Sequence, residues 1–281
     1  MLCGVAQMNS GKDVNDNLIE AEKLISSAAQ EGVRLLVLPE MFACLGVINQ
    51  HEMAISRFTE KDVLKTLAGW SKKFKMYLVA GSMPTINNTS KELTSKNQEQ
   101  CKKVNAACLV FSPEGKKIAD YHKIHLFDVD VADEKGSYKE SDTFIAGSKP
   151  VTVNVGEITL GLSICYDLRF PELFQHYMSE GCQIMTVPSA FTYQTGLMHW
   201  EVLLRARAIE TQSFILAANQ VGVHEDGRKT WGHSMIVSPD GDILAQVTKN
   251  EPGLAIAELN FEHLRKRRQA MPLQQHKRLT L

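Results

Sequence analysis

A pattern of twelve residues that occurs twice is the feature that most restricts the fold of this chain. Residues 31–42 read EGVRLLVLPEMF, and residues 180–191 read EGCQIMTVPSAF. Each copy contains a helix end, a glycine, a short apolar strand, a proline and a loop with a phenylalanine. Two further pairs of segments follow in the same order: YLVAG at 77–81 with FILAAN at 214–219, and VFSPEG at 110–115 with IVSPDG at 236–241.

The repeat predicts an α/β fold made of two copies of a strand–helix–strand–helix–strand–strand unit. Each copy would form a sheet that helices cover on one face. The bare apolar faces of the two sheets would then pack together, which gives a four-layer α-β-β-α sandwich with two internally related halves. Because the two copies match weakly residue by residue, chance similarity between two α/β units is the alternative explanation.

Local patterns predict several individual elements. Apolar residues at helical spacing between Leu18 and Ala28 predict a helix that Asn15 or Asp16 caps and that Gly32 ends. Residues 85–100 are polar and rich in Asn, Ser and Lys, which predicts an exposed loop.

Composition limits the class of protein. The formal net charge of −1 gives no reason to expect a nucleic-acid or membrane partner, and no apolar run approaches transmembrane length. The N-terminus lacks the basic region and apolar run of a signal peptide. The six cysteines form no C-x-x-C pair, so we interpret them as reduced thiols of a cytoplasmic protein. We expect one domain over residues 1–281.

Cys165 is the strongest candidate for a nucleophile. An apolar run brings it to a point where Pro171 and an amphipathic stretch begin a helix. Backbone N–H groups at a helix start favour a thiolate and can bind an oxyanion, and acyl transfer by a cysteine needs both. The remaining chain must then supply a base and a second group that stabilises charge.

Glu40 and Lys123 are the candidates for these two roles. Glu40 follows a buried strand, at the sheet edge where α/β proteins build their sites, although a solvated loop carboxylate is the simpler interpretation. Lys123 lies among aromatic and apolar residues and could stabilise a developing oxyanion. His122 and His125 suggest a Cys–His peptidase or a metal site, but their spacing is not that of helical metal ligands. We therefore expect no metal.

The three motifs together resemble the nitrilase, or carbon–nitrogen hydrolase, superfamily. The motifs are LPE at 38–40, YHKIHL at 121–126 and ICYDLRFPEL at 164–173, in the order that the superfamily has them. The resemblance implies a Glu40–Lys123–Cys165 triad, the four-layer sandwich, a thioester intermediate, no cofactor and a homodimer or larger homo-oligomer. It also implies that the Tyr166 backbone N–H helps to bind the oxyanion and that Glu140, with Glu134 as a competitor, positions the lysine.

A narrower resemblance is to the branch that acts as deaminated glutathione amidase, carried by PSAFT at 188–192 and by GLMHWEVLLRARAIET at 196–211. It implies an anionic amide substrate that is cleaved to 2-oxoglutarate and cysteinylglycine. Arg169, Phe191 and Thr192 are the candidates for substrate binding, although Arg169 could instead pair with Asp167 or Glu172. The alternatives are an ω-amidase that acts on 2-oxoglutaramate, another small carbon–nitrogen hydrolase, and a catalytically idle binding protein.

The C-terminal part of the chain changes character. Residues 261–269 predict a short helix with four basic residues, which we interpret as a solvated face rather than as a nucleic-acid site. Residues 271–281 look too extended to pack alone. We expect the tail over residues 262–281 to lie against a partner subunit.

Overall fold

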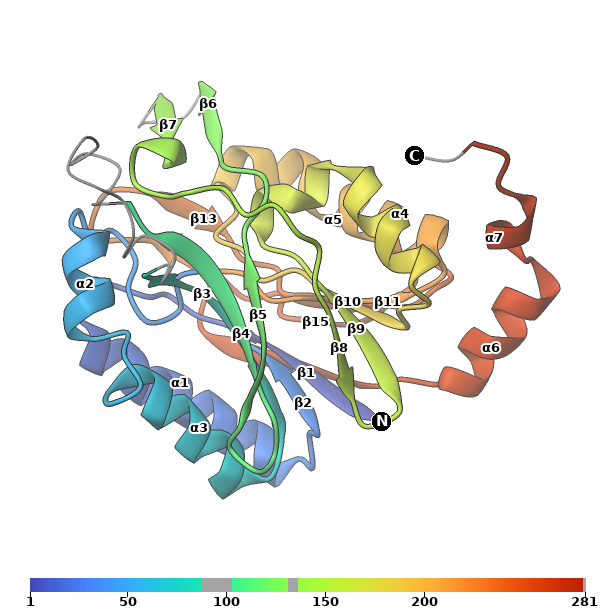
Figure 1. Ribbon diagram of the computed structural model, residues 1–281, viewed down its shortest axis with the longest axis horizontal. Coiled ribbons are helices and arrows are strands. Elements are labelled where there is room, and N and C mark those ends of the chain that lie inside the picture. The colour runs from blue at the N-terminus through green and yellow to red at the C-terminus, as the bar shows by residue number, and fades with distance from the viewer. Residues whose placement is uncertain (87–102, 131–135, 280–281) are drawn as a thin grey trace, which may run out of the picture.

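Two six-stranded sheets form the centre of the protein. The structure is a computed structural model that describes residues 1–86, 103–130 and 136–279 (Figure 1). The first sheet contains, in spatial order, β16 (Gly253–Glu258), β1 (Leu2–Gln7), β2 (Leu35–Val37), β3 (Tyr77–Thr85), β4 (Asn105–Phe111) and β5 (Lys117–His122). The second contains β15 (Ile243–Gln246), β14 (Met235–Val237), β11 (Phe214–Ala217), β10 (Ile184–Thr186), β9 (Ile158–Leu162) and β8 (Thr152–Val155).

The two sheets have the same topology, which confirms the internal repeat. Strands β1, β2 and β3 are parallel neighbours, and β4 and β5 continue that sheet antiparallel. Strands β9, β10 and β11 are likewise parallel, and β14 and β15 follow antiparallel. An antiparallel strand, β16 or β8, completes the other side of β1 or β9. Chance similarity does not reproduce a shared order and a shared set of strand directions.

Helices cover the outer face of each sheet, because parallel neighbours require crossover connections. Helices α1 (Val14–Gln30) and α3 (Val63–Phe74) lie on the first sheet, while α4 (Pro171–Ser179) and α5 (Tyr193–Thr211) lie on the second (Figure 1). The inner faces of the two sheets pack on each other in one apolar cluster. The four-layer α-β-β-α sandwich is therefore confirmed.

Strand β2 shows how the sequence produces these layers. Leu35 and Val37 point into the cluster between the sheets, and Leu36 points into the cluster beneath helices α1 and α3. Successive side chains of a strand face opposite sides, so a strand that is covered on both sides needs an unbroken apolar run. This is the reason that residues 33–39 contain so few polar side chains.

Helix α1 begins earlier than the sequence predicts. Its cap is Asp13, whose Oδ1 accepts hydrogen bonds from the backbone N–H groups of Asn15 (2.7 Å) and Asp16 (3.1 Å). The expectation that Asn15 or Asp16 caps the helix was therefore wrong. Gly32 has a φ of 83°, a conformation that favours glycine, and ends the helical segment as predicted. Most of the loop expected over residues 85–100 lies outside the described residues.

The smaller elements lie outside the two six-stranded sheets. They are α2 (Gln50–Ser56), the ribbon of β6 (Asp128–Asp130) and β7 (Ser137–Lys139), the ribbon of β12 (Val221–Val223) and β13 (Lys229–Trp231), and the 3-10 helices η3 (Glu140–Asp142) and η4 (Cys165–Arg169). No helix within the described ranges combines the length and the apolarity that crossing a bilayer requires.

The C-terminal helices dock on the second half of their own chain. Helix α6 (Phe261–Ala270) is basic, as predicted, but its Arg268 is not part of a solvated face. The Arg268 guanidinium donates to the backbone oxygens of Gln212 and Cys182, which follow α5 and α4. The tail expected to be extended contains α7 (Leu273–His276), and Gln212 Nε2 donates to Met271 O at 2.9 Å. Packing against a partner subunit stays a prediction.

Candidate active site

Glu40 is held rigidly between the two halves of the chain. It lies beyond the end of β2, and the residue is only 5% exposed. Its Oε2 accepts a hydrogen bond from the backbone N–H of Ala190 at 2.8 Å, and its backbone oxygen accepts one from Gln220 Nε2 at 3.0 Å. A carboxylate fixed in this way can receive a proton without first having to reorient.

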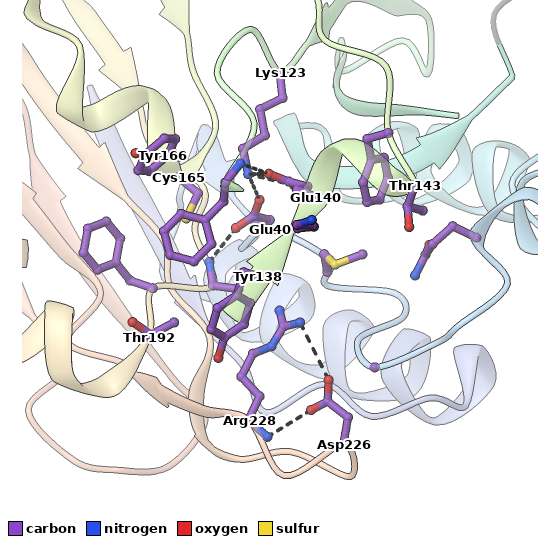
Figure 2. Close-up of a pocket in the computed structure, with 18 of the residues that line it drawn as sticks. Glu40, Lys123, Tyr138, Glu140, Thr143, Cys165, Tyr166, Thr192, Asp226 and Arg228 are labelled. Atoms are coloured by element: carbon purple, nitrogen blue, oxygen red, sulfur yellow. Dashed lines mark hydrogen bonds and ion pairs between the residues drawn. The ribbon is translucent and has the colours of Figure 1, made fainter. Parts of the chain in front are cut away.

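Lys123 lies directly after β5 and forms the centre of an ion cluster. The residue is 2% exposed. Its Nζ is 2.9 Å from Glu40 Oε1 and 2.9 and 2.8 Å from the two carboxylate oxygens of Glu140 (Figure 2). Burial alone would lower the pKa of Lys123, but the Glu140 and Glu40 carboxylates outweigh it and hold that pKa well above its usual value. The lysine is therefore a fixed cation.

Glu140 begins the short helix η3 and accepts three hydrogen bonds. Besides the two from Lys123, its Oε2 accepts one from the backbone N–H of Phe127 at 2.7 Å. Burial raises the pKa of Glu140 above its ordinary value, against the opposing effect of Lys123. Of the two candidates in this loop, Glu140 contacts the lysine, and Glu134 lies outside the described residues.

Cys165 opens η4 in a strained backbone conformation. Its φ is 47°, in the left-handed region that a residue with a Cβ rarely adopts, and its N–H donates to Pro188 O at 2.9 Å. Burial raises the pKa of the Cys165 thiol well above its ordinary value. The hydrogen-bonded Glu40 raises this pKa further, and Lys123 lowers it. Burial and Glu40 therefore oppose the thiolate that the helix start was expected to favour.

Asp167 joins the Cys165 turn to the Lys123 segment, a role that the sequence did not indicate. It is fully buried, and Oδ2 accepts from Tyr121 Oη (2.6 Å) and from the Ile164 N–H (2.8 Å). Its Oδ1 accepts from the backbone N–H of His125 at 3.0 Å and lies 2.7 Å from His125 Nδ1. Tyr121 and His125 flank Lys123, so this one carboxylate sets the position of the Cys165 turn relative to Lys123.

The two histidines of this segment have separate partners. The His125 ring stacks on Phe170 with its centroid 3.7 Å away, while His122 Nε2 lies 3.2 Å from Asp120 Oδ1. They do not converge on one point, as a peptidase base or a pair of metal ligands would require.

A pocket of about 390 Å³ opens above the ion cluster and Cys165. Every residue that the sequence proposed for this site contributes to its lining: Glu40, Lys123, Glu140, Cys165, Tyr166, Arg169, Phe191 and Thr192 (Figure 2). Tyr166 is the second residue of η4, so its N–H has no acceptor within that helix.

Arg169 lines the pocket, where its guanidinium contacts His199 and the Phe191 ring rather than a carboxylate. The guanidinium lies 3.3 Å from His199 Nδ1 and 5.3 Å from the centroid of the Phe191 ring. Among the residues that the structure describes, no ion pair joins Arg169 to Asp167 or Glu172. The predicted alternative, in which Arg169 pairs with Asp167 or Glu172, is therefore wrong.

The sequence did not identify a second arginine in the pocket, Arg228. It follows the turn between β12 and β13, and its guanidinium lies 5.5 Å from the centroid of the Tyr138 ring. Asp226, in the same turn, also lines the pocket. The only signal was a charged Asp-Gly turn, which is ordinary on a protein surface.

Comparisons with known proteins identify the family. The sequence profile of the carbon–nitrogen hydrolase family matches residues 2–269. The chain is 44% identical to a deaminated glutathione amidase of Synechocystis over 283 aligned positions, covering 98% of this chain and 97% of the relative. It is 36% identical to an omega-amidase of Xenopus laevis, covering 95% and 91% of the two chains.

Solved structures show the same fold. The nitrilase-superfamily protein Nit3 of Saccharomyces cerevisiae superposes with a TM-score of 0.85 at 29% identity, covering 99% of this chain and 97% of that one. The profile match and the full-length relatives, together with this fold, show that the chain belongs to the carbon–nitrogen hydrolase family and is a hydrolase of carbon–nitrogen bonds other than peptide bonds.

Proposed function

We propose that this chain is an amidase that hydrolyses the side-chain amide of deaminated glutathione and releases 2-oxoglutarate and cysteinylglycine. The observation that carries the proposal is the contact of Lys123 with both Glu40 and Glu140 beside the half-buried Cys165. The same pocket contains Arg169, which pairs with no carboxylate among the described residues. The name of the Synechocystis relative supports the substrate.

The catalytic cycle follows from the positions of the side chains. The Cys165 thiol gives its proton to Glu40 as the sulfur attacks the amide carbonyl carbon. Lys123 Nζ and the Tyr166 N–H stabilise the resulting oxyanion. Glu40 then protonates the leaving amine, the C–N bond breaks, and a thioester to Cys165 remains.

Water completes the cycle. Glu40 takes a proton from a water molecule that attacks the thioester carbonyl, and that proton returns to the departing Cys165 sulfur. Glu140 holds Lys123 in place through two hydrogen bonds and does not itself exchange a proton with the substrate. No metal or organic cofactor enters any step.

A second candidate function is hydrolysis of 2-oxoglutaramate, with ammonia as the product. The similarity to the Xenopus omega-amidase favours it. The deciding experiment measures kcat/KM on the two amides side by side, with mass detection of 2-oxoglutarate, cysteinylglycine and ammonia. A higher kcat/KM on deaminated glutathione supports the first proposal, and a higher value on 2-oxoglutaramate supports the second. The Cys165→Ala variant must lose turnover of both.

The proposal extends to assembly and location. Exposed apolar side chains on α5 favour a homodimer or larger homo-oligomer, since Leu197, Met198 and Val202 are 57%, 58% and 67% exposed. Sedimentation of the wild type and of Val202→Glu tests this, because the charge should shift the protein towards the monomer. The five described cysteines are free thiols, which supports a cytoplasmic protein. The ligand is a small anionic amide, and neither nucleic acid nor a membrane is a partner.

A further inference from the structure

Arg228 is held in the pocket by a well-anchored hairpin. The turn between β12 and β13 closes with hydrogen bonds between the backbones of His224 and Arg228 (2.9 Å) and of Gly227 and His224 (2.9 Å). His224 ties the hairpin to the body, because its Nδ1 lies 2.9 Å from Ser10 O and its Nε2 lies 2.7 Å from Thr230 Oγ1. The arginine is therefore presented by a rigid support, as a recognition residue must be.

The Arg228 guanidinium forms an ion pair with Asp226 but makes no direct side-chain hydrogen bond to a described residue. Its Nε is buried and has no hydrogen-bond partner there. Its Nη2 lies 3.7 Å from Asp226 Oδ2, which is beyond a direct hydrogen bond, and Asp226 Oδ1 accepts the backbone N–H of Arg228 at 3.1 Å. A buried donor without an acceptor costs free energy, and a carboxylate is the group that matches a guanidinium edge best. Figure 2 shows this guanidinium directed into the pocket.

Arg228 and Arg169 belong to different parts of the pocket. Arg169 lies in the same short helix as Cys165, with its guanidinium near the rings of Tyr166 and Phe191. The Arg228 turn instead packs on the loop after Glu40, where a Cβ on Gly46 would lie 3.2 Å from Asp226 Cβ. That loop also lines the pocket and carries Ile48, which is 95% exposed. Arg228 thus lies on the side of the pocket that this exposed loop lines, apart from Cys165 (Figure 2).

The substrate of the proposed function has one carboxylate on each side of its scissile amide. The 2-oxoglutaryl part becomes attached to Cys165 and stays behind, whereas cysteinylglycine leaves first and must extend away from Cys165. We infer that Arg228 is a specificity-determining residue that binds the C-terminal carboxylate of the leaving dipeptide, while Arg169 faces the acyl part. This inference rests on the proposed function and adds a binding subsite to it.

Three substrates test the inference: deaminated glutathione, its analogue with a C-terminal carboxamide, and 2-oxoglutaramate, which lacks the dipeptide. We expect the wild type to prefer the free carboxylate over the carboxamide by about 10-fold or more in kcat/KM, the effect of one charge-assisted contact. Arg228→Gln should lower kcat/KM for the free acid by about 10- to 100-fold, mainly through KM. It should leave the other two substrates within about twofold.

Two controls separate binding from structure. Arg265→Gln, which removes an arginine that pairs with Glu262 on the exposed surface of α6, should change none of the three values. Should Arg228→Gln not fold, the wild type decides the question. Cysteinylglycine must then inhibit 2-oxoglutaramate hydrolysis more strongly than cysteinylglycinamide does.

Different results would overturn the inference about Arg228 and the proposed function. Equal losses on all three substrates in Arg228→Gln, or no wild-type preference for the free carboxylate, would overturn the inference alone. Wild-type turnover of 2-oxoglutaramate without turnover of deaminated glutathione would overturn the proposed function and the inference together.

Discussion

The backbone N–H of Ala190 donates a hydrogen bond to Glu40 Oε2 at 2.8 Å, although the two residues are 150 positions apart. Glu40 lies at the end of the second strand in one copy of the repeat, and Ala190 lies at the corresponding end in the other copy. The contact fixes one oxygen of the carboxylate and leaves the other oxygen to Lys123. The interface between the two halves therefore orients the proposed base.

Replacement of that base should remove activity without unfolding the protein. We expect Glu40→Gln to lower kcat on the preferred amide by about 10²- to 10⁴-fold, because the amide cannot accept the thiol proton. Steady-state kinetics with circular dichroism as a check on folding measures this. Glu201→Gln, at a half-exposed carboxylate on α5, is the matched control and should keep kcat within about twofold. An active Glu40→Gln would remove Glu40 from the mechanism.

Asp167 should contribute strongly to stability. We expect Asp167→Asn to lower the free energy of unfolding by about 2–3 kcal/mol. The buried carboxylate accepts hydrogen bonds from Tyr121, Ile164 and His125. The NH₂ group of an asparagine would face at least one of these N–H or O–H donors, and that hydrogen bond would be lost. Urea denaturation measures the change. Asp16→Asn, at an exposed position of α1, should change stability by less than about 0.5 kcal/mol. Equal effects at the two positions would contradict the central role of Asp167.

Alanine is usually a more stable replacement than glycine, and the left-handed backbone at Cys165 predicts the opposite order of stability there. Cys165→Gly should be at least as stable as Cys165→Ala, by up to about 1 kcal/mol, because glycine adopts a φ of 47° without strain. At Cys108, which lies inside β4, alanine should be the more stable replacement. Chemical denaturation of the four variants compares the two orders. The same order at both positions would show that Cys165 carries no strain.

We expect the folded protein to lose stability on acidification because of His224. Burial lowers the pKa of His224 below its ordinary value of 6.5, so the unfolded chain binds a proton more readily than the folded protein does. Stability is then fully present above about pH 6.5 and falls as the pH decreases from there towards the lower folded pKa. The slope due to this one proton is at most about 1.4 kcal/mol per pH unit.

The variant His224→Asn isolates this effect. Urea denaturation of both proteins between pH 5 and 8 should show a shallower acid loss in the variant, although the variant is less stable at neutral pH because it loses the contacts with Ser10 and Thr230. If the free energy of unfolding depends on pH in the same way in the wild type and in His224→Asn, groups other than His224 cause the acid loss.

The architecture was accessible from the sequence because the two halves repeat the same local signals. Apolar runs such as residues 33–39 indicate strands that are buried on both faces, because only such a strand needs an almost unbroken series of apolar side chains. The cap of α1 was misplaced by a few residues, since Asn15, Asp16 and Asp13 are all good caps and only the backbone geometry selects one. Glu40, Lys123 and Cys165 were found because each lies in a distinctive short motif.

The sequence alone determined the repeat, the sandwich and the residues of the candidate site, because these depend on local pattern and residue type. The tertiary structure decided which groups act on one another. It placed Ala190 on Glu40, joined the Cys165 turn to the Lys123 segment through Asp167 and brought Arg228 into the pocket from a distant hairpin. It also raised the pKa of the Cys165 thiol through burial and the nearby Glu40. These relationships depend on distances and burial between segments far apart in the chain, which no local pattern encodes.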